Sequence, residues 1–258
     1  MADRVMDELE RANLHQIEAL NQRGGRTLSI VDLVLANTIS AEAAARVGAG
    51  IAGGASFLTA ANPGGAGKTA LLAALLGFLP SGVPIVTIDG PGSLSAAERA
   101  GGGWCCLAHE IGAGHWYGYV WGREVERYLA LPARGHWIAS CLHADTLEEV
   151  HERLEECSIA DPAAALAGVD YLLFMHVDRP RGRWRHRVAA IYGPGADGRR
   201  ALLFRWNGEA DALEPHDPGV RSTDERPLAE LIRSLADKGV RDIAAVRRAI
   251  LEFRGGCP

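Results

Sequence analysis

The sequence contains very little lysine. Lys68 and Lys238 are its only lysines among 258 residues, although lysine and arginine together number 27. The chain therefore uses arginine almost wherever it needs a positive charge. A lysine at position 68, inside a glycine-rich stretch, indicates a place where a compact ammonium group is required.

Other absences disfavour whole classes of protein. Acidic residues outnumber basic ones by 32 to 27, and the formal net charge of -5 argues against a broad basic surface for nucleic acid. No apolar run approaches the roughly 20 residues that span a bilayer. The charged residues Asp3, Arg4 and Asp7 are untypical of a signal peptide. We therefore expect a cytoplasmic protein that makes no direct contact with nucleic acid.

Cysteine pairs of the CxxC type are also missing, which argues against a zinc ribbon. The five cysteines are Cys105, Cys106, Cys141, Cys157 and Cys257. In a reducing cytosol they are expected to be thiols, and the first three lie in apolar runs that are typical of buried positions. A metal site formed by Cys106, His109 and His115 is disfavoured, because their spacing matches no common zinc pattern.

What is present is an alternation of apolar strands and helices. An amphipathic helix is predicted over residues 2–22, with Ala12 in its apolar stripe, and a second helix is predicted to begin at Ser40 and end in the glycine-rich stretch 48–54. Continuous apolar strands between helices predict a mostly parallel sheet that is covered on both faces. The strands are predicted over 56–61, 85–88, 104–108, 137–142 and 171–177, and the helices between them over 68–79, 121–131 and 146–157, the last opened by a capping box.

The pattern changes after the last of these strands. Segments 187–192 and 201–206 flank a turn rich in glycine and proline, and they predict an antiparallel hairpin. A polar loop is predicted over 207–226, and two helices are predicted near 227–237 and 242–253. The expected organisation is an N-terminal helix (1–25), an α/β core (26–178) and a hairpin with a C-terminal helical extension (179–258).

The strongest motif occupies residues 62–69, which read Asn-Pro-Gly-Gly-Ala-Gly-Lys-Thr. It matches the P-loop pattern except that Asn62 stands at the first glycine, where asparagine tolerates a left-handed backbone better than most residues. In such a loop, backbone N–H groups and a helix N-terminus hold phosphates. Lys68 is expected to bridge the β- and γ-phosphates, and the Thr69 hydroxyl is expected to bind Mg²⁺. The residues expected to contact ATP are Asn62, Gly64, Gly65, Ala66, Gly67, Lys68, Thr69 and Ala70.

Three residues that follow apolar strands are predicted to be catalytic. Asp89 can polarise water or hold Mg²⁺, and a plain turn cap is the alternative. Glu110 fits a Walker B element whose carboxylate orients the attacking water, although the usual aspartate is absent and a plain buried strand is the alternative. His143 can reach a phosphate in the cleft and report its presence, whereas a lone histidine is more often structural.

Taken in order, these motifs resemble the ATPase family of type II and type IV secretion systems, type IV pili and archaeal surface filaments. Residues 85–89 resemble that family's Asp box and residues 108–111 its Walker B element. His136 and residues 141–145 resemble its His box. The ending, with residues 203–206 and two helices, is closest to the archaeal and tight-adherence branches.

The resemblance runs from about Arg26 to the C-terminus. It implies a RecA-like P-loop NTPase fold, ATP and Mg²⁺ as ligands, self-association as a hexameric ring, an inner-membrane platform protein as partner, and a place in the cytoplasm or at the inner face of the membrane. The chain departs from the family in several respects. Asp89 and Gly90 stand where its Asp box usually has Glu and Asp, and Gly112 stands where it has arginine. The large N-terminal domain is reduced to little more than one helix, and an insertion after Glu110 includes the aromatic stretch 114–119. The stretch between Asp89 and Glu110 is much shorter than in the family, where it normally carries arginines that help catalysis.

Three functions are compatible with these features. The first is a motor in which ATP hydrolysis drives protein export or pilus assembly. The second is a divergent nucleotide-binding regulator or scaffold that hydrolyses little ATP. The third is a small-molecule kinase, in which the arginines of residues 179–183 would form a lid, and the His box argues against it.

Replacing Lys68 with alanine tests the P-loop. Its charge-assisted contacts with phosphate are worth about 1.5–3 kcal/mol each, so the affinity for ATP should fall at least about tenfold. A titration of the purified variant with fluorescently labelled ATP measures this. An affinity equal to that of the unaltered protein would contradict the assignment.

Overall fold

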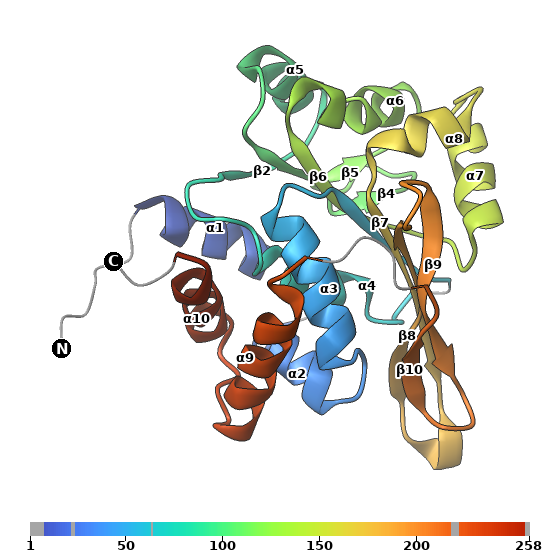
Figure 1. Cartoon of the computed structure of the whole chain (residues 1–258). Helices are drawn as coiled ribbons and strands as arrows, with labels where there is room; N and C mark the ends of the chain where they lie inside the picture. The colour runs from blue at the N-terminus through green and yellow to red at the C-terminus, as the bar shows by residue number, and fades with distance from the viewer. Residues whose placement is uncertain (1–7, 22–23, 63, 218–221, 256–258) are drawn as a thin grey trace.

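The computed structural model describes residues 8–21, 24–62, 64–217 and 222–255. It is a mixed α/β fold in which helices lie on both faces of one sheet (Figure 1). The first residues of the helix predicted over 2–22, together with Cys257 and Pro63, lie outside the described residues. Within the described residues no helix is long and apolar enough to cross a membrane.

The parallel half of the sheet has the order β7-β1-β6-β3-β2, and β1, the strand before the P-loop, lies between β7 and β6. Its strands are β1 (Phe57–Ala60), β2 (Ile85–Thr87), β3 (Cys105–Leu107), β6 (Trp137–Leu142) and β7 (Tyr171–Asp178). The predicted mostly parallel sheet is confirmed. Because the strands are parallel, the P-loop, Asp89, Glu110 and His143 all follow strands that end at the same edge.

The antiparallel half extends the same sheet from β7. The predicted hairpin is confirmed as β8 (Arg185–Pro194) and β9 (Arg200–Asn207). The loop predicted over 207–226 is wrong in part, because β10 (Ala212–Pro215) pairs with β9. The Asn207 side chain accepts the N–H groups of Glu209 and Ala210, and this tight turn brings a short edge strand back against β9. A further short strand, β4 (Glu110–Ile111), pairs with β6, and β5 (Tyr119–Val120) pairs with β4.

Alternate side chains of β1 enter two separate cores. Phe57 points to one core and Leu58 to the other. The first core is covered by α1 (Glu8–Ala19), α2 (Ile30–Leu35), α3 (Ala41–Ala52), α4 (Lys68–Leu76), α9 (Glu225–Asp237) and α10 (Ile243–Gly255). The second is covered by α5 (Pro91–Ala100), α6 (Arg123–Leu129), α7 (Leu147–Glu156) and α8 (Pro162–Ala165). Short 3₁₀ turns occur at Pro132–Arg134, Leu166–Gly168 and Pro180–Gly182.

Side-chain caps account for four of the helix starts. Ser29, Ser40, Thr146 and Asp161 each accept a backbone N–H from the first turn of the helix that follows. The box predicted at Thr146 is only half formed, because the Glu149 carboxylate accepts the N–H of Asp145 instead. Helix α5 had no sequence prediction, since only Leu94 and Ala97 of its residues are buried.

The buried face of α1 is more polar than the predicted apolar stripe. Ala12 is exposed, whereas Glu10 and Asn13 are buried. The Asn13 amide donates to the carbonyl of Val83 and accepts the N–H of Ile85, so it pairs with the backbone beside edge strand β2. The stripe was mispredicted because these polar side chains find partners that only the folded chain brings near.

A buried ion pair ties α10 to α1 and to the end of α4. Arg247 is 1% exposed, and its Nε and Nη2 donate to the two carboxylate oxygens of Glu10 at 2.8 and 2.9 Å. Its Nη1 donates to the carbonyls of Leu76, Gly77 and Leu79. A cation at the C-terminal end of a helix is favoured by the helix dipole, so this arginine also stabilises α4.

Replacing Arg247 with alanine should lower the free energy of unfolding by about 3–5 kcal/mol, because it leaves the Glu10 carboxylate buried without its cation. Chemical denaturation measures the change. The adjacent Arg248 is exposed, and its replacement by alanine is the control, expected to change the stability by about 0.5 kcal/mol or less. Equal losses in the two variants would contradict the role of the pair.

Candidate nucleotide-binding and catalytic site

The P-loop joins the central strand β1 to helix α4. The Thr59 hydroxyl donates to the carbonyl of Lys68, which fastens the start of α4 to the strand. Helix α4 begins at Lys68, and its N-cap residue Gly67 provides no side-chain cap. The N–H groups of its first turn are therefore left for an anion, which is the arrangement that binds phosphates at helix N-termini.

Two glycines of the P-loop have backbone conformations that other residues rarely adopt. Gly65 and Gly67 have φ of 93° and 102°, in the left-handed region. A Cβ atom on Gly67 would also come within 3.1 Å of Met175 Cε, and the nearby His186 Nδ1 donates to the Ala66 carbonyl at 3.0 Å. Strands β7 and β8 thus support the loop from below.

Asn62 does not have the left-handed conformation expected of it, since it is not among the described residues with positive φ. A glycine is therefore not needed at this first position of the motif. The Asn62 N–H donates to Asp145 Oδ1 at 2.6 Å, so the loop entrance is held by the segment that follows β6.

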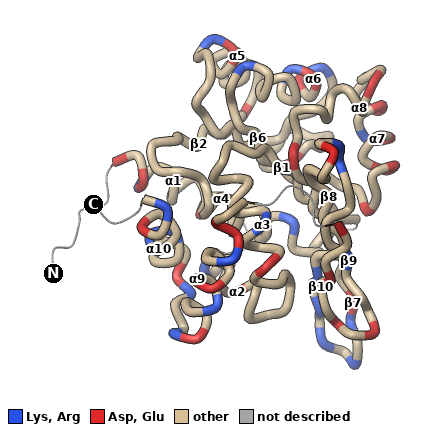
Figure 2. The backbone as a smooth tube through the Cα atoms, viewed as in Figure 1, with Lys and Arg blue, Asp and Glu red and all other residues tan. Residues whose placement is uncertain are grey.

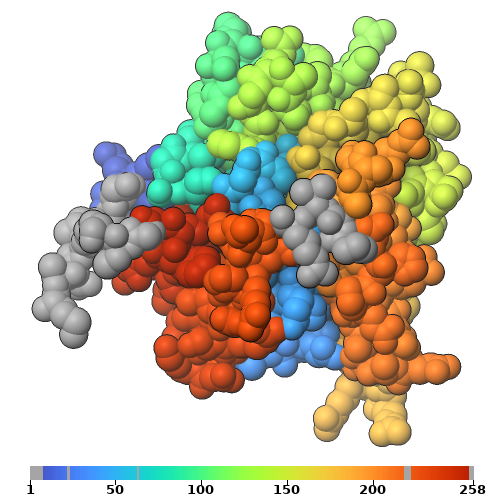
Figure 3. Space-filling model, in the orientation of Figure 1, coloured from blue at the N-terminus to red at the C-terminus, as the bar shows by residue number. Residues whose placement is uncertain are grey.

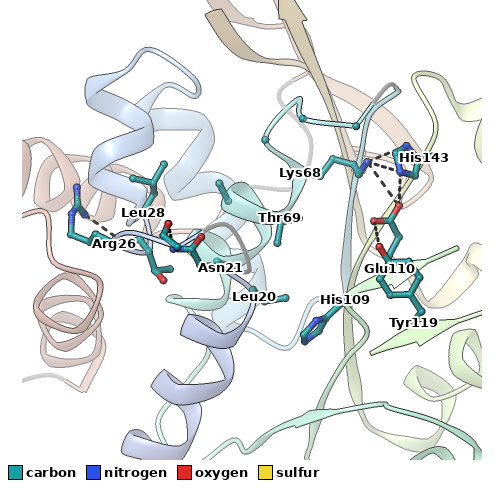
Figure 4. Close-up of a pocket in the computed structure, with 17 residues that line it drawn as sticks. Leu20, Asn21, Arg26, Leu28, Lys68, Thr69, His109, Glu110, Tyr119 and His143 are labelled. Atoms are coloured by element: carbon teal, nitrogen blue, oxygen red, sulfur yellow. Dashed lines mark hydrogen bonds and ion pairs between the residues drawn. The ribbon is translucent and has the colours of Figure 1, made fainter. Parts of the chain in front are cut away.

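A cavity of about 560 Å³ opens above the P-loop (Figure 4). Its walls come from three parts of the chain: the P-loop, the ends of β3 and β6 with β5, and the segment between α1 and α2. The lining residues are Leu20, Asn21, Gly24, Arg26, Thr27, Leu28, Gly64, Gly65, Gly67, Lys68, Thr69, Ala70, Ala73, His109, Glu110, Tyr119 and His143. Most of the predicted P-loop contacts are among them, while Asn62 and Ala66 are not.

Lys68, Glu110 and His143 meet at one side of this cavity (Figure 4). His143 Nε2 lies 2.8 Å from Glu110 Oε1, and Lys68 Nζ lies 3.3 Å from His143 Nδ1 and 4.0 Å from Glu110 Oε1. Lys68 Nζ also donates to the Ala61 carbonyl at 3.2 Å. The Lys68 and Glu110 side chains are 6% and 12% exposed, so a cation and a carboxylate face each other in a nearly enclosed place.

Tyr119 is a site residue that the sequence did not single out. Its hydroxyl donates to Glu110 Oε2 at 3.4 Å. Burial, together with the Glu110 charge, raises the pKa of Tyr119, so the phenol keeps its proton and remains a donor. Tyrosine in the aromatic insertion was visible in the sequence, but its approach to Glu110 depends on the pairing of β4 with β5.

His109 is a second cavity residue, which the sequence analysis considered only as a disfavoured metal ligand. It is 5% exposed and lines the cavity, and neither ring nitrogen has a hydrogen-bond partner within the described residues. Burial lowers the pKa of His109, so the ring is neutral. Tyr117 packs edge-on against the ring, with the ring centres 5.3 Å apart. The backbone N–H of His109 donates to the Gly118 carbonyl. The insertion after Glu110 therefore covers this histidine.

Leu20, Asn21, Gly24 and residues 26–28 line the other side of the cavity. The sequence analysis placed the first three of these in the N-terminal helix (1–25), but α1 ends at Ala19. Arg26 is held there by a two-pronged ion pair with Asp32. Although burial alone would raise the pKa of Asp32, hydrogen bonds from Arg26, Ser29 and Arg241 hold it at about 2.

Two other predicted residues lie away from the cavity. Asp89 is exposed and does not line it, and its N–H donates to the Ser93 hydroxyl at the start of α5. His136 is buried, accepts the Trp104 N–H and donates to the Ala97 carbonyl. His136 thus ties α5 to the sheet.

The residues present fit a magnesium ion only if the phosphates of a bound nucleotide supply some of its ligands. Within the described ranges no three His, Cys, Asp or Glu side chains form a group that could hold a metal. The Thr69 hydroxyl lines the cavity beside the start of α4. Magnesium prefers oxygen ligands, keeps several waters and is commonly shared between a protein oxygen and substrate phosphates.

Comparison with known proteins finds similarity only at the level of structure. The chain is similar to the VirB11 ATPase from the Brucella suis type IV secretion system in complex with sulphate, at 18% identity and a TM-score of 0.45, over 57% of this chain and 52% of that one. It is also similar to the Legionella pneumophila ATPase DotB, at 14% identity and a TM-score of 0.37, over 74% of this chain and 55% of that one. The chain thus spans about half the length of the solved structures it matches. No known protein family and no curated protein matches the sequence.

Replacing His143 with alanine separates a phosphate sensor from a structural histidine. Since His143 contacts Lys68 and Glu110 and its side chain is 39% exposed, its loss should leave the melting temperature within a few degrees, or about 1 kcal/mol, while ATP turnover falls. Thermal unfolding and a phosphate-release assay measure the two effects. The exposed His216 is the control, and its replacement by alanine should change neither. A large fall in melting temperature with normal turnover per folded molecule would show that His143 is structural.

Proposed function

We propose that this chain binds ATP with Mg²⁺ in the cavity above the P-loop and hydrolyses it, and that hydrolysis drives protein export or pilus assembly. The observation that supports the proposal best is the convergence of Lys68, Glu110 and His143 beside an uncapped helix N-terminus. The link to export and pili rests on the order of the sequence motifs, not on the structural similarities.

Each part of the cluster has a role in this proposal. The N–H groups of Gly65 to Thr69 and the Lys68 ammonium bind the phosphates, and Lys68 then exchanges His143 for phosphate oxygens. Glu110 accepts a proton from the water that attacks the γ-phosphorus, so that ADP and phosphate are the products. Thr69 would hold a magnesium ion, which would supply positive charge to offset the charge on the phosphate oxygens. Tyr119 holds Glu110 in position through its hydroxyl.

The far side of the cavity suits the nucleoside. Leu28 is exposed and offers apolar surface, and Asn21 and Arg26 offer polar groups beside it. An aromatic base packs on apolar side chains and is oriented by a few polar ones. In this proposal the segment between α1 and α2 therefore contacts the base and ribose, which the sequence analysis did not foresee.

A non-motor role is the second candidate, and two observations favour it. Arg26 is the only arginine among the cavity-lining residues of the described chain, and it is already paired with Asp32. Asp89 lies outside the cavity. Fewer charged groups around the γ-phosphate mean slower hydrolysis, because such groups stabilise the transition state. In this candidate the chain is a nucleotide-binding regulator or scaffold of the same system.

The small-molecule kinase interpretation depended on a lid of arginines over the nucleotide. The arginines at 179, 181 and 183, which could have formed a lid, do not line the cavity. They lie at the far end of the hairpin formed by β7 and β8. The proposed partners remain copies of the chain in a hexameric ring and an inner-membrane platform protein, with the chain in the cytoplasm or at the inner face of the membrane.

Two measurements on the purified protein distinguish the two candidates: its ATP turnover, and its molecular mass in solution by light scattering. Turnover that rises with assembly into a ring supports the motor. Tight ATP binding by a monomer with negligible turnover supports the regulator. Failure to bind ATP at all would overturn both.

Replacing Glu110 with glutamine should retain ATP binding and lower turnover by about 10²–10⁴-fold, the usual loss when a general base is removed. The matched control is Asp89→Asn, which removes the same charge outside the cavity and should leave most of the turnover. Phosphate release under saturating ATP measures both variants. If Asp89→Asn abolishes turnover while Glu110→Gln retains it, the Walker B assignment of Glu110 is wrong.

A further inference from the structure

The hairpin formed by β7 and β8 ends in a cluster of arginines. Arginine occupies every second position from 179 to 187. The last two are neutralised, since Arg185 pairs with Asp178 and Arg187 pairs with Asp211. These two pairs, and the packing of Arg185 on Trp206 at 5.0 Å, fix the base of the hairpin.

The remaining three arginines form a charged tip without matching acids. Arg179, Arg181 and Arg183 are exposed, and none of them forms an ion pair within the described residues. The tip projects from the body of the protein, and its basic residues gather at that end (Figures 2 and 3). The whole chain carries a net charge of -5, so this positive tip is a local exception.

Apolar groups accompany the charge. Trp184 is 65% exposed, and the Arg179 guanidinium lies 5.2 Å from its ring centre. A hollow of about 800 Å³ beside the tip is lined by Pro180, Trp184, Ala36 and the neighbouring arginines. Leu35, which precedes Ala36, is also exposed at 51%. An exposed tryptophan and leucine among unpaired arginines are costly in water and gain from an interface that is apolar on one side and anionic on the other.

We infer that the tip, defined as residues 179–184, binds the surface of an anionic lipid bilayer. Unpaired arginines are attracted to acidic headgroups, and tryptophan lies favourably at the level of the headgroups. A protruding hairpin end can meet a flat surface without a clash. Single-stranded nucleic acid is the less favourable partner, because it is bound in grooves with several stacking rings and the tip has one.

This surface is separate from the nucleotide site. No residue that lines the hollow beside the tip also lines the cavity above the P-loop. The inference does not rest on the proposed ATPase activity, and a protein without turnover could still bind membranes in this way.

Vesicle co-sedimentation tests the inference with the full chain. Vesicles of phosphatidylcholine are compared with vesicles that also contain phosphatidylserine. The test variant carries Arg179→Gln, Arg181→Gln and Arg183→Gln. Each arginine near an anionic surface contributes about fivefold in affinity, so the variant should bind the acidic vesicles roughly a hundredfold more weakly.

The matched control removes the same charge at the opposite end of the molecule. Arg99, Arg123 and Arg134 are exposed on α5, at the start of α6 and in the turn after α6, and all three are changed to glutamine (Figure 1). This control should retain binding within about twofold. Circular dichroism melting checks that both variants fold. A third variant, Trp184→Ser, should weaken binding without any change of charge.

Three outcomes would overturn the inference. The unaltered protein could fail to bind acidic vesicles. Both arginine variants could lose binding equally, which would make net charge the cause. A labelled single-stranded oligonucleotide could bind the tip in preference to the vesicles, which would make nucleic acid the partner.

Discussion

Helix α4 is the element on which the rest of the molecule depends, because its N-terminal end is open to an anion and its C-terminal end binds a cation. Its N-terminal end has no side-chain cap and leaves N–H groups for an anion, whereas four other helices are capped by Ser, Thr or Asp. Its C-terminal carbonyls receive the buried Arg247. The fold itself thus supplies a cation for the C-terminal end of the helix dipole and leaves the N-terminal end open to an anion. Since Lys68 is the first residue of α4, whatever holds the helix also positions this lysine.

The ion pair between Arg247 and Glu10 connects this helix to both ends of the chain. Glu10 lies on α1 and Arg247 on α10, so a single contact joins residues separated by 237 positions and closes one face of the sheet. Breaking such a pair is costly because either charge alone remains buried. Leu20 and Asn21, which follow α1, and residues 26–28 line the cavity. Residues on both sides of the predicted boundary at residue 25 therefore line one cavity.

The cavity and the hairpin tip use arginine and lysine in different ways. The cavity contains the compact ammonium of Lys68 among a histidine and a carboxylate, where a point charge fits between phosphate oxygens. The tip carries broad guanidinium groups in solvent next to an exposed indole. Strand β7 links the two places, since Met175 supports the P-loop and Asp178 anchors the base of the tip. A chemical site and a candidate docking surface are therefore held by one strand of the sheet.

The sequence alone determined the strands and helices whose signals are local. Apolar runs such as Trp137 to Leu142, the Thr146 cap and the P-loop spacing predicted their elements because each depends on neighbours along the chain.

Only the tertiary structure decided which polar residues meet. Tyr119 reaches Glu110 through the pairing of two short strands. Arg26 lies at the cavity because Asp32 holds it there. Asp89 stays outside the cavity although its strand ends at the same edge of the sheet. Helix α5 and strand β10 escaped prediction because their stability comes from packing and pairing with distant segments and hardly from their own sequence. Contacts between residues far apart in the chain depend on strand order and on helix packing, and neither of these is written in any short stretch of sequence.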